Sequence, residues 1–249
     1  MIPSWLRLAQ LRSTLRRFQV PRDAVRWALA RYAERTALIT PTATFTYAAL
    51  GERVLSLANG WSALGVRKGD HVFTHLHDDH EQIEVRLAAY ELGVILTSFN
   101  EAHALDLITR AVRMAPPTMF VIGPRTDERV RAMLVRECPS MPILRTGPGD
   151  TYERVIAQHQ PRESTSKIAP SDPAALGFTS GTTGLPKALY VDQQIALTSL
   201  RLTLANVRIV PSSAPQVTLL CIPLIGAGSG LVLPSILAGG ALVIPSSYD

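Results

Sequence analysis

The most informative segment of the chain reads FTSGTTGLPK from Phe178 to Lys187. It places three threonines, one serine, two glycines and one lysine in a short loop between apolar segments. Glycines let backbone N–H groups approach phosphate oxygens, hydroxyls donate hydrogen bonds to them, and an ammonium group neutralises their charge. The segment therefore predicts a phosphate-binding loop rather than an ordinary turn rich in threonine and glycine.

This loop differs from the Walker A motif of P-loop nucleotide-binding proteins. That motif needs a glycine directly before its lysine and a serine or threonine directly after it. Here Pro186 precedes Lys187 and Ala188 follows it. We therefore expect a different class of nucleotide-binding protein.

Downstream of the loop, residues 209–248 contain no charged side chain. A lipid-exposed helix would have to satisfy its backbone across the many prolines and glycines of this run, which argues against a membrane span. The run instead predicts a buried strand over 217–222, a glycine-rich turn, a buried helix over 231–237 and a buried strand over 241–244.

Upstream of the loop, helices and strands alternate. Thr46 is the expected N-cap of a long helix over 47–64 that Gly65 closes. The expected helices are 23–35, 47–64, 80–92 and 103–114, and the expected strands are 37–39, 71–76, 94–97 and 118–122. This βαβαβ order predicts an α/β fold, with a layered parallel sheet covered on both faces.

Two segments suggest how the chain is organised. A polar stretch rich in proline and serine, about 158–173, reads as a linker within one large domain over 21–249. Residues 1–20 read as an N-terminal extension, with a basic amphipathic helix over 4–18. We expect this helix to dock on its own domain, with a membrane-surface contact or a targeting role as alternatives.

Composition limits the class of protein. The chain has 249 residues, of which 47% are apolar and 18% charged, so a disordered or collagen-like protein is excluded. The formal net charge of +5 comes mainly from 22 scattered arginines, which is weak support for nucleic-acid binding. Cys138 and Cys221 are far apart in sequence, which fits a reducing compartment such as the cytoplasm.

A second motif, HLHDDH from His75 to His80, matches the HxHxDH pattern of metallo-β-lactamase-type hydrolases. Two imidazoles on one metal and an Asp–His pair on another would activate a water molecule. Such enzymes also need histidines further downstream, and only His103 and His159 follow. The alternative is a strand-to-helix turn in which Asp78 or Asp79 caps the helix over 80–92.

The loop strongly resembles the signature loop of the adenylate-forming superfamily, which includes acyl-CoA synthetases, firefly luciferase and the adenylation domains of peptide synthetases. Other segments resemble the family in the expected order. They are TFTYAAL from Thr44, GVRKGD from Gly65, the segment from Leu92 to Asn100 that begins with LGV, IPL from Ile222, and AGGA from Ala238. The resemblance covers about Val25 to the C-terminus and implies the layered parallel-sheet large domain of that fold.

The resemblance implies an acid–thiol ligase of the acyl-CoA synthetase type. Such an enzyme uses ATP to convert a carboxylic acid, here a fatty or other apolar acid, into an acyl-adenylate and then a coenzyme A thioester. It implies that the β- and γ-phosphates are held by Thr179, Ser180, Gly181, Thr182, Thr183, Gly184 and Lys187. Thr182 would be a partner of Mg²⁺. The implied cofactors are ATP and Mg²⁺, with coenzyme A as co-substrate.

Three positions depart from the family pattern and leave the acid undefined. Ala188 stands where glycine is usual, Asp192-Gln193 stands where a threonine–histidine pair is common, and Ile225-Gly226 stands where many acyl-CoA synthetases have an aromatic residue and a histidine. Segment 225–230 would line part of the acid pocket.

The family also places later motifs beyond the signature loop, among them a lid domain with a catalytic lysine. We therefore expect an incomplete large domain that cannot form an acyl-adenylate alone and acts with a C-terminal complementing chain or as part of a longer protein. An inactive remnant that serves as a binding module is the alternative.

Overall fold

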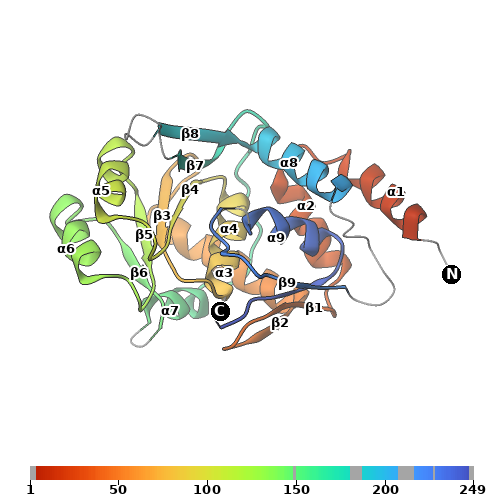
Figure 1. Cartoon of the computed structure of the whole chain (residues 1–249), viewed down its shortest axis with the longest axis horizontal. Coiled ribbons are helices and arrows are strands. Elements are labelled where there is room, and N and C mark those ends of the chain that lie inside the picture. Colours follow the sequence, from red (N-terminus) through yellow and green to blue (C-terminus); the bar gives the residue numbers. More distant parts are fainter. Residues whose placement is uncertain (1–3, 148–149, 180–186, 207–215, 227, 247–249) are drawn as a thin grey trace.

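A computed structural model describes residues 4–147, 150–179, 187–206, 216–226 and 228–246. Its described elements form two β-sheets with helices packed between and around them (Figure 1). Segments from both ends of the chain meet in the smaller sheet. The α/β fold expected from the alternating pattern is therefore confirmed.

The larger sheet has six strands in the order β6-β5-β3-β4-β7-β8. Its strands are β3 (His71–His75), β4 (Ile95–Phe99), β5 (Met119–Ile122), β6 (Ile143–Arg145), β7 (Pro173–Thr179) and β8 (Lys187–Asp192). All neighbouring pairs are parallel except β7 and β8, which form an antiparallel hairpin. The parallel sheet was expected, whereas β6 and the hairpin were not.

The smaller sheet has four strands in the order β2-β1-β10-β9. Its strands are β1 (Thr36–Ile39), β2 (Thr44–Thr46), β9 (Val217–Leu219) and β10 (Ala241–Val243). The β1–β10 and β10–β9 pairs are parallel, and β1–β2 is antiparallel. This sheet joins strands that lie about 200 residues apart in sequence, so the two ends of the chain share one core.

The described helices are α1 (Ser4–Leu15), α2 (Pro21–Arg31), α3 (Tyr47–Ala63), α4 (His80–Leu92), α5 (Leu105–Met114), α6 (Glu128–Glu137), α7 (Thr151–Gln158), α8 (Gln193–Asn206) and α9 (Ser229–Leu237). Two predicted caps are confirmed. The Thr46 side chain accepts a hydrogen bond from the Ala49 backbone N–H at 3.1 Å, and Asp79 caps α4. Gly65 follows α3 with a positive φ of 96°, which only glycine adopts at low cost.

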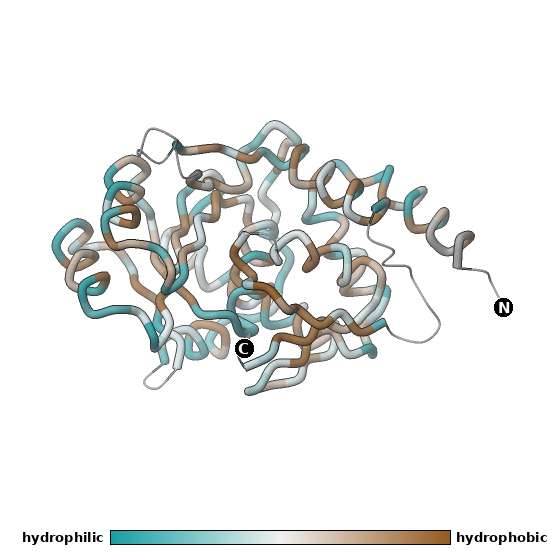
Figure 2. Tube along the Cα trace, in the orientation of Figure 1, coloured by the Kyte–Doolittle hydropathy of each residue, from teal (hydrophilic) through white to brown (hydrophobic). Residues whose placement is uncertain are grey.

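The main core lies around α3 and α4, which pack on each other between the two sheets (Figure 1). Tyr47 and Trp61 of α3 are fully buried there, and the Tyr47 hydroxyl donates to the Gly240 carbonyl at 2.7 Å. Figure 2 shows apolar residues along the strands and on the helix faces that meet them. A second core, on the other face of the larger sheet, packs α5 and α6 against Phe73 and Phe120.

The N-terminal helix is shorter than predicted and docks on the rest of the protein. Its Leu11 and Leu15 are buried in the main core, and Arg201 of α8 donates hydrogen bonds to the Leu15 and Phe18 carbonyls. None of the described helices is long and apolar enough to cross a membrane. The docking of α1 agrees with the first of the three interpretations of residues 4–18.

Two other expectations need correction. The predicted buried strand over 217–222 is the short edge strand β9, whose Val217 and Leu219 side chains are 65% and 55% exposed. The predicted linker has no helix or strand between α7 and β7, yet hydrogen bonds hold it against the core, so it is not a free connection. The Ser164 N–H donates to Glu91, and the Ser166 hydroxyl donates to the Leu92 carbonyl.

Candidate functional site

The carboxyl ends of the parallel strands define the candidate site. Strands β3, β4, β5 and β7 run in one direction, so His75, Phe99, Ile122 and Thr179 end at the same edge of the larger sheet. Ligands of open α/β sheets bind at this edge, where connections leave on opposite faces. Strand β3 is flanked by β4 and β5, so the carboxyl end of β3 is a position where connections leave on opposite faces.

The β7–β8 hairpin brings the two ends of the predicted phosphate loop together at this edge. Thr179 and Lys187 are cross-strand partners in its register. The other predicted site residues, Ser180, Gly181, Thr182, Thr183 and Gly184, lie outside the described residues. Lys187 is exposed and forms no ion pair with any residue that the structure describes, so its ammonium group is available to an anion.

Aromatic rings support the start of this hairpin. The Phe178 ring stacks on Phe99 with ring centroids 6.2 Å apart and planes 23° apart. Phe99 is buried and also meets Phe73 and His103 edge-on, at 5.8 and 5.5 Å. The last residue before Thr179 is therefore packed on the neighbouring parallel strand rather than left at a free loop end.

A polar hollow of about 380 Å³ lies at the ends of β3, β4 and β5. It is lined by His75, Glu101, Ala102, His103, Ala104, Leu105, Arg125, Asp127, Arg129 and Val130. The Thr126 hydroxyl donates to the His75 carbonyl and lies 3.0 Å from His75 Nδ1. Burial lowers the pKa of both His75 and His103, so both imidazoles are mostly neutral at pH 7.

The cations of this hollow differ in their partners. Arg129 is paired with Asp127, and its hydrogen bonds lower the pKa of that carboxyl to about 2. Arg125 is exposed and has no hydrogen-bond or ion-pair partner within the described part of the chain. The Arg125 guanidinium, with its planar set of donors, can therefore bind a carboxylate or a phosphate.

The segment after β9 reaches the same edge. The Asp78 carboxylate, in the turn after β3, accepts a hydrogen bond from the Leu224 backbone N–H at 3.1 Å. This contact places Ile225-Gly226, two of the positions that depart from the family pattern, beside the β3–α4 turn. No sequence signal identified the contact between Asp78 and Leu224, because these two residues are separated by 146 positions.

The other departing positions begin α8. The Asp192 carboxylate accepts a hydrogen bond from the Ile195 N–H at 2.6 Å and so caps the helix. Gln193 is fully buried, and neither polar atom of its side-chain amide has a hydrogen-bond partner in the described structure. Burying an amide in this way costs free energy, and the structure offers no account of it.

The HxHxDH motif forms the expected strand-to-helix turn and not a hydrolase centre. Asp79 caps α4 through the His80 N–H at 2.7 Å, and His80 Nδ1 lies 3.1 Å from the same carboxylate oxygen. Among the described residues, the groups that could hold a metal ion are Asp79-His80-Glu81 and His80-Glu84-Glu153. Neither contains His75 or His77, so the metallohydrolase alternative lacks its ligand set.

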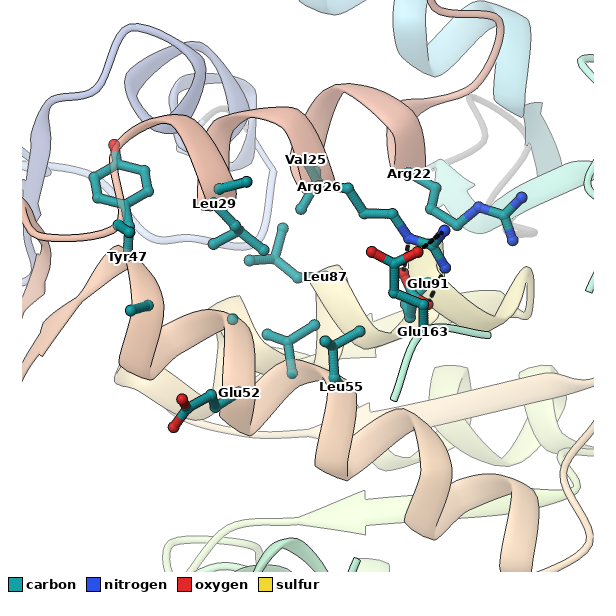
Figure 3. Close-up of a pocket in the computed structure, with 15 residues that line it drawn as sticks. Arg22, Val25, Arg26, Leu29, Tyr47, Glu52, Leu55, Leu87, Glu91 and Glu163 are labelled. Carbon is teal, nitrogen blue, oxygen red and sulfur yellow. Dashed lines mark hydrogen bonds and ion pairs between the residues drawn. The ribbon is translucent and has the colours of Figure 1, made fainter. Parts of the chain in front are cut away.

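A separate apolar cleft of about 290 Å³ lies between α2 and α3 (Figure 3). Val25, Leu29, Leu55 and Leu87 form its walls. Arg26 closes one end, where its guanidinium bonds Glu91 at 2.9 Å and Glu163 at 2.7 Å. Glu91 lies in the last turn of α4, just before β4 begins, so this end of the cleft lies toward the amino end of β4 and not at the carboxyl edge of the sheet.

Comparisons with known proteins agree with this geometry. A family model described as AMP-binding enzyme matches residues 25–249. The chain is 27% identical over 174 residues to a crotonobetaine/carnitine–CoA ligase of Salmonella arizonae, covering 64% of this chain and 34% of that protein. It is 28% identical over 152 residues to a protein of Bacillus subtilis named "putative acyl–CoA ligase YdaB", covering 59% of this chain and 30% of that protein.

Among solved structures, the chain resembles a protein of Rhodopseudomonas palustris named "putative long-chain-fatty-acid CoA ligase". The TM-score is 0.78 and the identity 26%, with 92% of this chain and 58% of that chain covered. ATP-bound MatB of the same organism shares the fold, with a TM-score of 0.73, 24% identity, and 89% of this chain and 45% of that chain covered. The chain thus spans about a third of the curated relatives and about half of the solved ones.

Proposed function

The chain belongs to the AMP-binding enzyme family, and on that premise we propose that it supplies the triphosphate-binding part of an acid–thiol ligase. Such a ligase joins a carboxylic acid to the α-phosphorus of ATP, releases pyrophosphate and then transfers the acyl group to a thiol. The curated relatives described above are named as a crotonobetaine/carnitine–CoA ligase and a "putative acyl–CoA ligase". The proposal concerns the activity of the whole ligase, of which this chain spans a part.

The observation that carries the proposal is the pairing of Thr179 with Lys187 at the carboxyl edge of the larger sheet. The sequence between these strand ends is rich in glycine and in hydroxyl side chains, residue types that bind phosphate oxygens. We assign the β- and γ-phosphates to Thr179, Ser180, Gly181, Thr182, Thr183, Gly184 and Lys187. An exposed lysine without an ion-pair partner among the described residues suits a polyanion.

Mg²⁺ fits the same assignment. When bound, it would neutralise phosphate charge and orient the chain of phosphates. Thr182 is the residue that we propose as its partner, since hydroxyl and phosphate oxygens are ligands that Mg²⁺ prefers. Lys187 would then provide the second positive charge of the site. The contribution of this chain is to position the triphosphate and to balance its charge.

We propose that an apolar acid approaches beside the turn after β9. Asp78 holds Leu224 against the β3–α4 turn, so the apolar Ile225 and the following Gly226 lie near the carboxyl edge of the larger sheet. The absence of a charged side chain over 209–248 favours an apolar acid, such as a fatty acid, over a polar one.

The polar hollow is our proposed contact for the thiol substrate, coenzyme A, which carries phosphate groups. Arg125 would pair with one of these phosphates. His103 lies edge-on to the Phe99 ring, which in turn packs on Phe178, so the hollow adjoins the base of the phosphate loop.

Because Cys138 and Cys221 are free, we place the enzyme in the reducing cytoplasm.

Binding of ATP and Mg²⁺ to the 249-residue chain, measured by titration calorimetry, tests the proposal. We expect binding that Lys187→Ala weakens and that Lys167→Ala, a change of an exposed lysine in the segment before β7, leaves unchanged. An equal loss of ATP affinity in both variants, or no ATP binding by the unaltered chain, would contradict the assignment of the phosphates to this loop. Binding without any acyl-adenylate formation after addition of the missing part of the ligase would favour the inactive binding module.

A further inference from the structure

The N-terminal helix α1 forms one end of the molecule, next to α8 (Figure 1). One side of it is docked: Leu11 and Leu15 are buried, and the Arg201 guanidinium donates to the Leu15 and Phe18 carbonyls at 2.8 and 3.0 Å. The matched family model begins at residue 25, so α1 lies outside the part of the chain that the model matches. The side of α1 that faces water therefore has no role in the family assignment.

Three arginines lie on that water-facing side, and we call them the basic cluster. Arg12, Arg16 and Arg17 are exposed, and their side chains form no ion pair or hydrogen bond with any residue that the structure describes. The Arg16 N–H donates to the Arg12 carbonyl at 3.2 Å, so the helical turn continues and these two side chains share one side of it. The last turn of α1 therefore presents positive charge that no neighbour neutralises.

The formal charge of the chain is concentrated at this end. Residues 1–22 and helix α8 together hold six arginines, no lysine and no acidic residue, so they carry +6. The whole chain carries +5, so the rest of it carries −1. The acidic residues next in sequence are Asp23, which lies 3.9 Å from Arg22, and Asp192, which caps the start of α8. Charge of one sign at one end of a molecule attracts and orients that end on an anionic surface.

An exposed apolar side chain adjoins the basic cluster. Leu202 follows Arg201 in α8 and is 59% exposed. Because Arg201 bonds the last turn of α1, Leu202 lies near that turn. Cations beside an exposed leucine suit the interface of an anionic bilayer, where guanidinium groups meet phosphates and an apolar side chain enters the headgroup region. Nucleic-acid binding depends on a larger number of phosphate contacts and gains little from a leucine.

We propose that the basic cluster and Leu202 hold the protein on an anionic phospholipid surface. The guanidinium groups would pair with headgroup phosphates, and Leu202 would enter the interface. Helix α1 would not insert, because its Leu11 and Leu15 are already buried in the protein. This proposal goes beyond the proposed function and does not depend on the phosphate loop.

Co-sedimentation of the 249-residue chain with phospholipid vesicles tests the proposal. We expect binding to vesicles that contain anionic phosphatidylglycerol, and far weaker binding to vesicles of phosphatidylcholine alone. Binding should fall as the salt concentration rises, because salt screens exposed charges. The double variant Arg12→Gln/Arg16→Gln should weaken binding about 25-fold, at about fivefold for each arginine near the surface.

Arg145→Gln/Arg154→Gln is the matched control. Both arginines are exposed and their side chains have no partner among the described residues, and they lie on β6 and α7, toward the other end of the molecule (Figure 1). The control lowers the net charge by the same amount and should leave vesicle binding nearly unchanged. Circular dichroism should show that both double variants are folded. No preference for anionic vesicles, or equal losses in the two double variants, would overturn the proposal.

A second pair of variants separates a lipid surface from a nucleic acid. Leu202→Ser should weaken vesicle binding severalfold because it removes the apolar contact, whereas Met114→Ser, at an exposed methionine of α5, should not. Vesicle binding that is insensitive to Leu202→Ser would contradict the interfacial contact. Tighter binding to a DNA duplex than to the anionic vesicles would assign the basic cluster to nucleic acid and overturn the proposal.

The Lys187→Ala variant separates this proposal from the proposed function. It should lose affinity for ATP and retain vesicle binding, and Arg12→Gln/Arg16→Gln should do the reverse. An unaltered chain that binds ATP but no anionic vesicle would overturn the lipid contact alone. An unaltered chain that binds anionic vesicles but no ATP would overturn the proposed function alone.

Discussion

Phe178 stacks on Phe99, with ring centroids 6.2 Å apart and an interplanar angle of 23°. The contact joins the last residue before Thr179 to the buried end of the neighbouring parallel strand. It gives the hairpin that carries the predicted phosphate loop a fixed position relative to the polar hollow, since Phe99 also packs on His103. The two parts of the candidate site therefore share one aromatic support.

Removing the buried partner should destabilise the protein strongly. Phe99→Ala is expected to lower the free energy of unfolding by about 3–5 kcal/mol, because it deletes a buried ring and leaves a cavity. Urea unfolding followed by circular dichroism measures the change. Met114→Ala, at a side chain that is 57% exposed, should change it by less than about 1 kcal/mol. A similar small effect at Phe99 would contradict the support role.

Lys187→Ala should slow acyl-adenylate formation in the complete ligase. Loss of a charge-assisted contact to phosphate is expected to cost about 2–4 kcal/mol in the transition state, or about 30- to 1000-fold in rate. Pyrophosphate exchange measures this rate. Lys167→Ala should leave it unchanged. An unchanged rate in the Lys187 variant would show that the loop does not bind the triphosphate.

Arg53 of α3 should be essential for stability. It pairs with Glu153 and with the fully buried Glu84, which also accepts from the Tyr152 hydroxyl at 2.8 Å. Arg53→Met leaves a buried carboxylate without its cation and should lower the free energy of unfolding by about 3–5 kcal/mol. Thermal or urea unfolding tests this expectation.

The control for Arg53 is an exposed ion pair. Arg113 pairs with Glu137 at 2.8 Å, with the arginine side chain 64% exposed. Arg113→Ala should change the free energy of unfolding far less than Arg53→Met does, because water screens such a pair. Equal effects of the two substitutions would show that burial of Glu84 is not what makes the Arg53 contact important.

The Asp79 cap should make stability depend on acid. Burial opposes ionisation of this carboxyl, yet hydrogen bonds from the His80 side chain and backbone N–H lower its pKa to about 2. A lowered pKa in the folded state gives stability that is fully present above about pH 4 and is lost as the pH falls toward 2. Asp79→Asn keeps a capping side chain but cannot ionise. It should therefore remove about 2 kcal/mol of the change in the free energy of unfolding between pH 4 and pH 2.

The measurement is the free energy of unfolding between pH 2 and 5, for the unaltered chain and for Asp79→Asn. The two curves should converge at the acid end of this range. The His80 imidazole provides an opposite signature: burial lowers its pKa, but the hydrogen bond to Asp79 and the negative charges of Glu81, Glu84 and Asp79 together outweigh burial and raise the pKa. Its contribution is present below about pH 6.5 and is lost as the pH rises through the raised pKa. Parallel curves between pH 2 and 5 would contradict the Asp79 assignment.

The HxHxDH residues should hold no stoichiometric catalytic metal. His75 is committed to Thr126, and Asp79 to the helix cap. Metal analysis of the purified protein, with His77→Ala as the comparison, is expected to show no zinc that depends on His77. Stoichiometric zinc lost in this variant, together with hydrolase activity, would restore the metallohydrolase interpretation.

Local chemistry in the sequence was enough to predict much of the fold. The bounds of α4 are those expected, because Asp79 caps its start and Gly93 ends it in the left-handed region with φ of 79°. The strands β3, β4 and β5 of the larger sheet followed from short apolar runs between helices. The expected elements did not include α6, β6, α7 or α8.

The phosphate-loop motif was evident in the sequence by itself, because its residue types are adjacent in the chain. Adjacent residues keep their chemical meaning in whatever fold surrounds them. The sequence alone therefore determined the family, the α/β class and the identity of Lys187 as the candidate phosphate ligand.

Tertiary structure alone decided which distant groups meet and which remain uncovered. The stack of Phe178 on Phe99 and the contact of Asp78 with Leu224 join residues 79 and 146 positions apart, and no periodic pattern encodes such pairs. Likewise, Val217 and Leu219 form an apolar run that predicts burial, but burial depends on what packs against a strand. Within the described residues β9 is the edge strand of its sheet, and its Val217 and Leu219 side chains remain exposed.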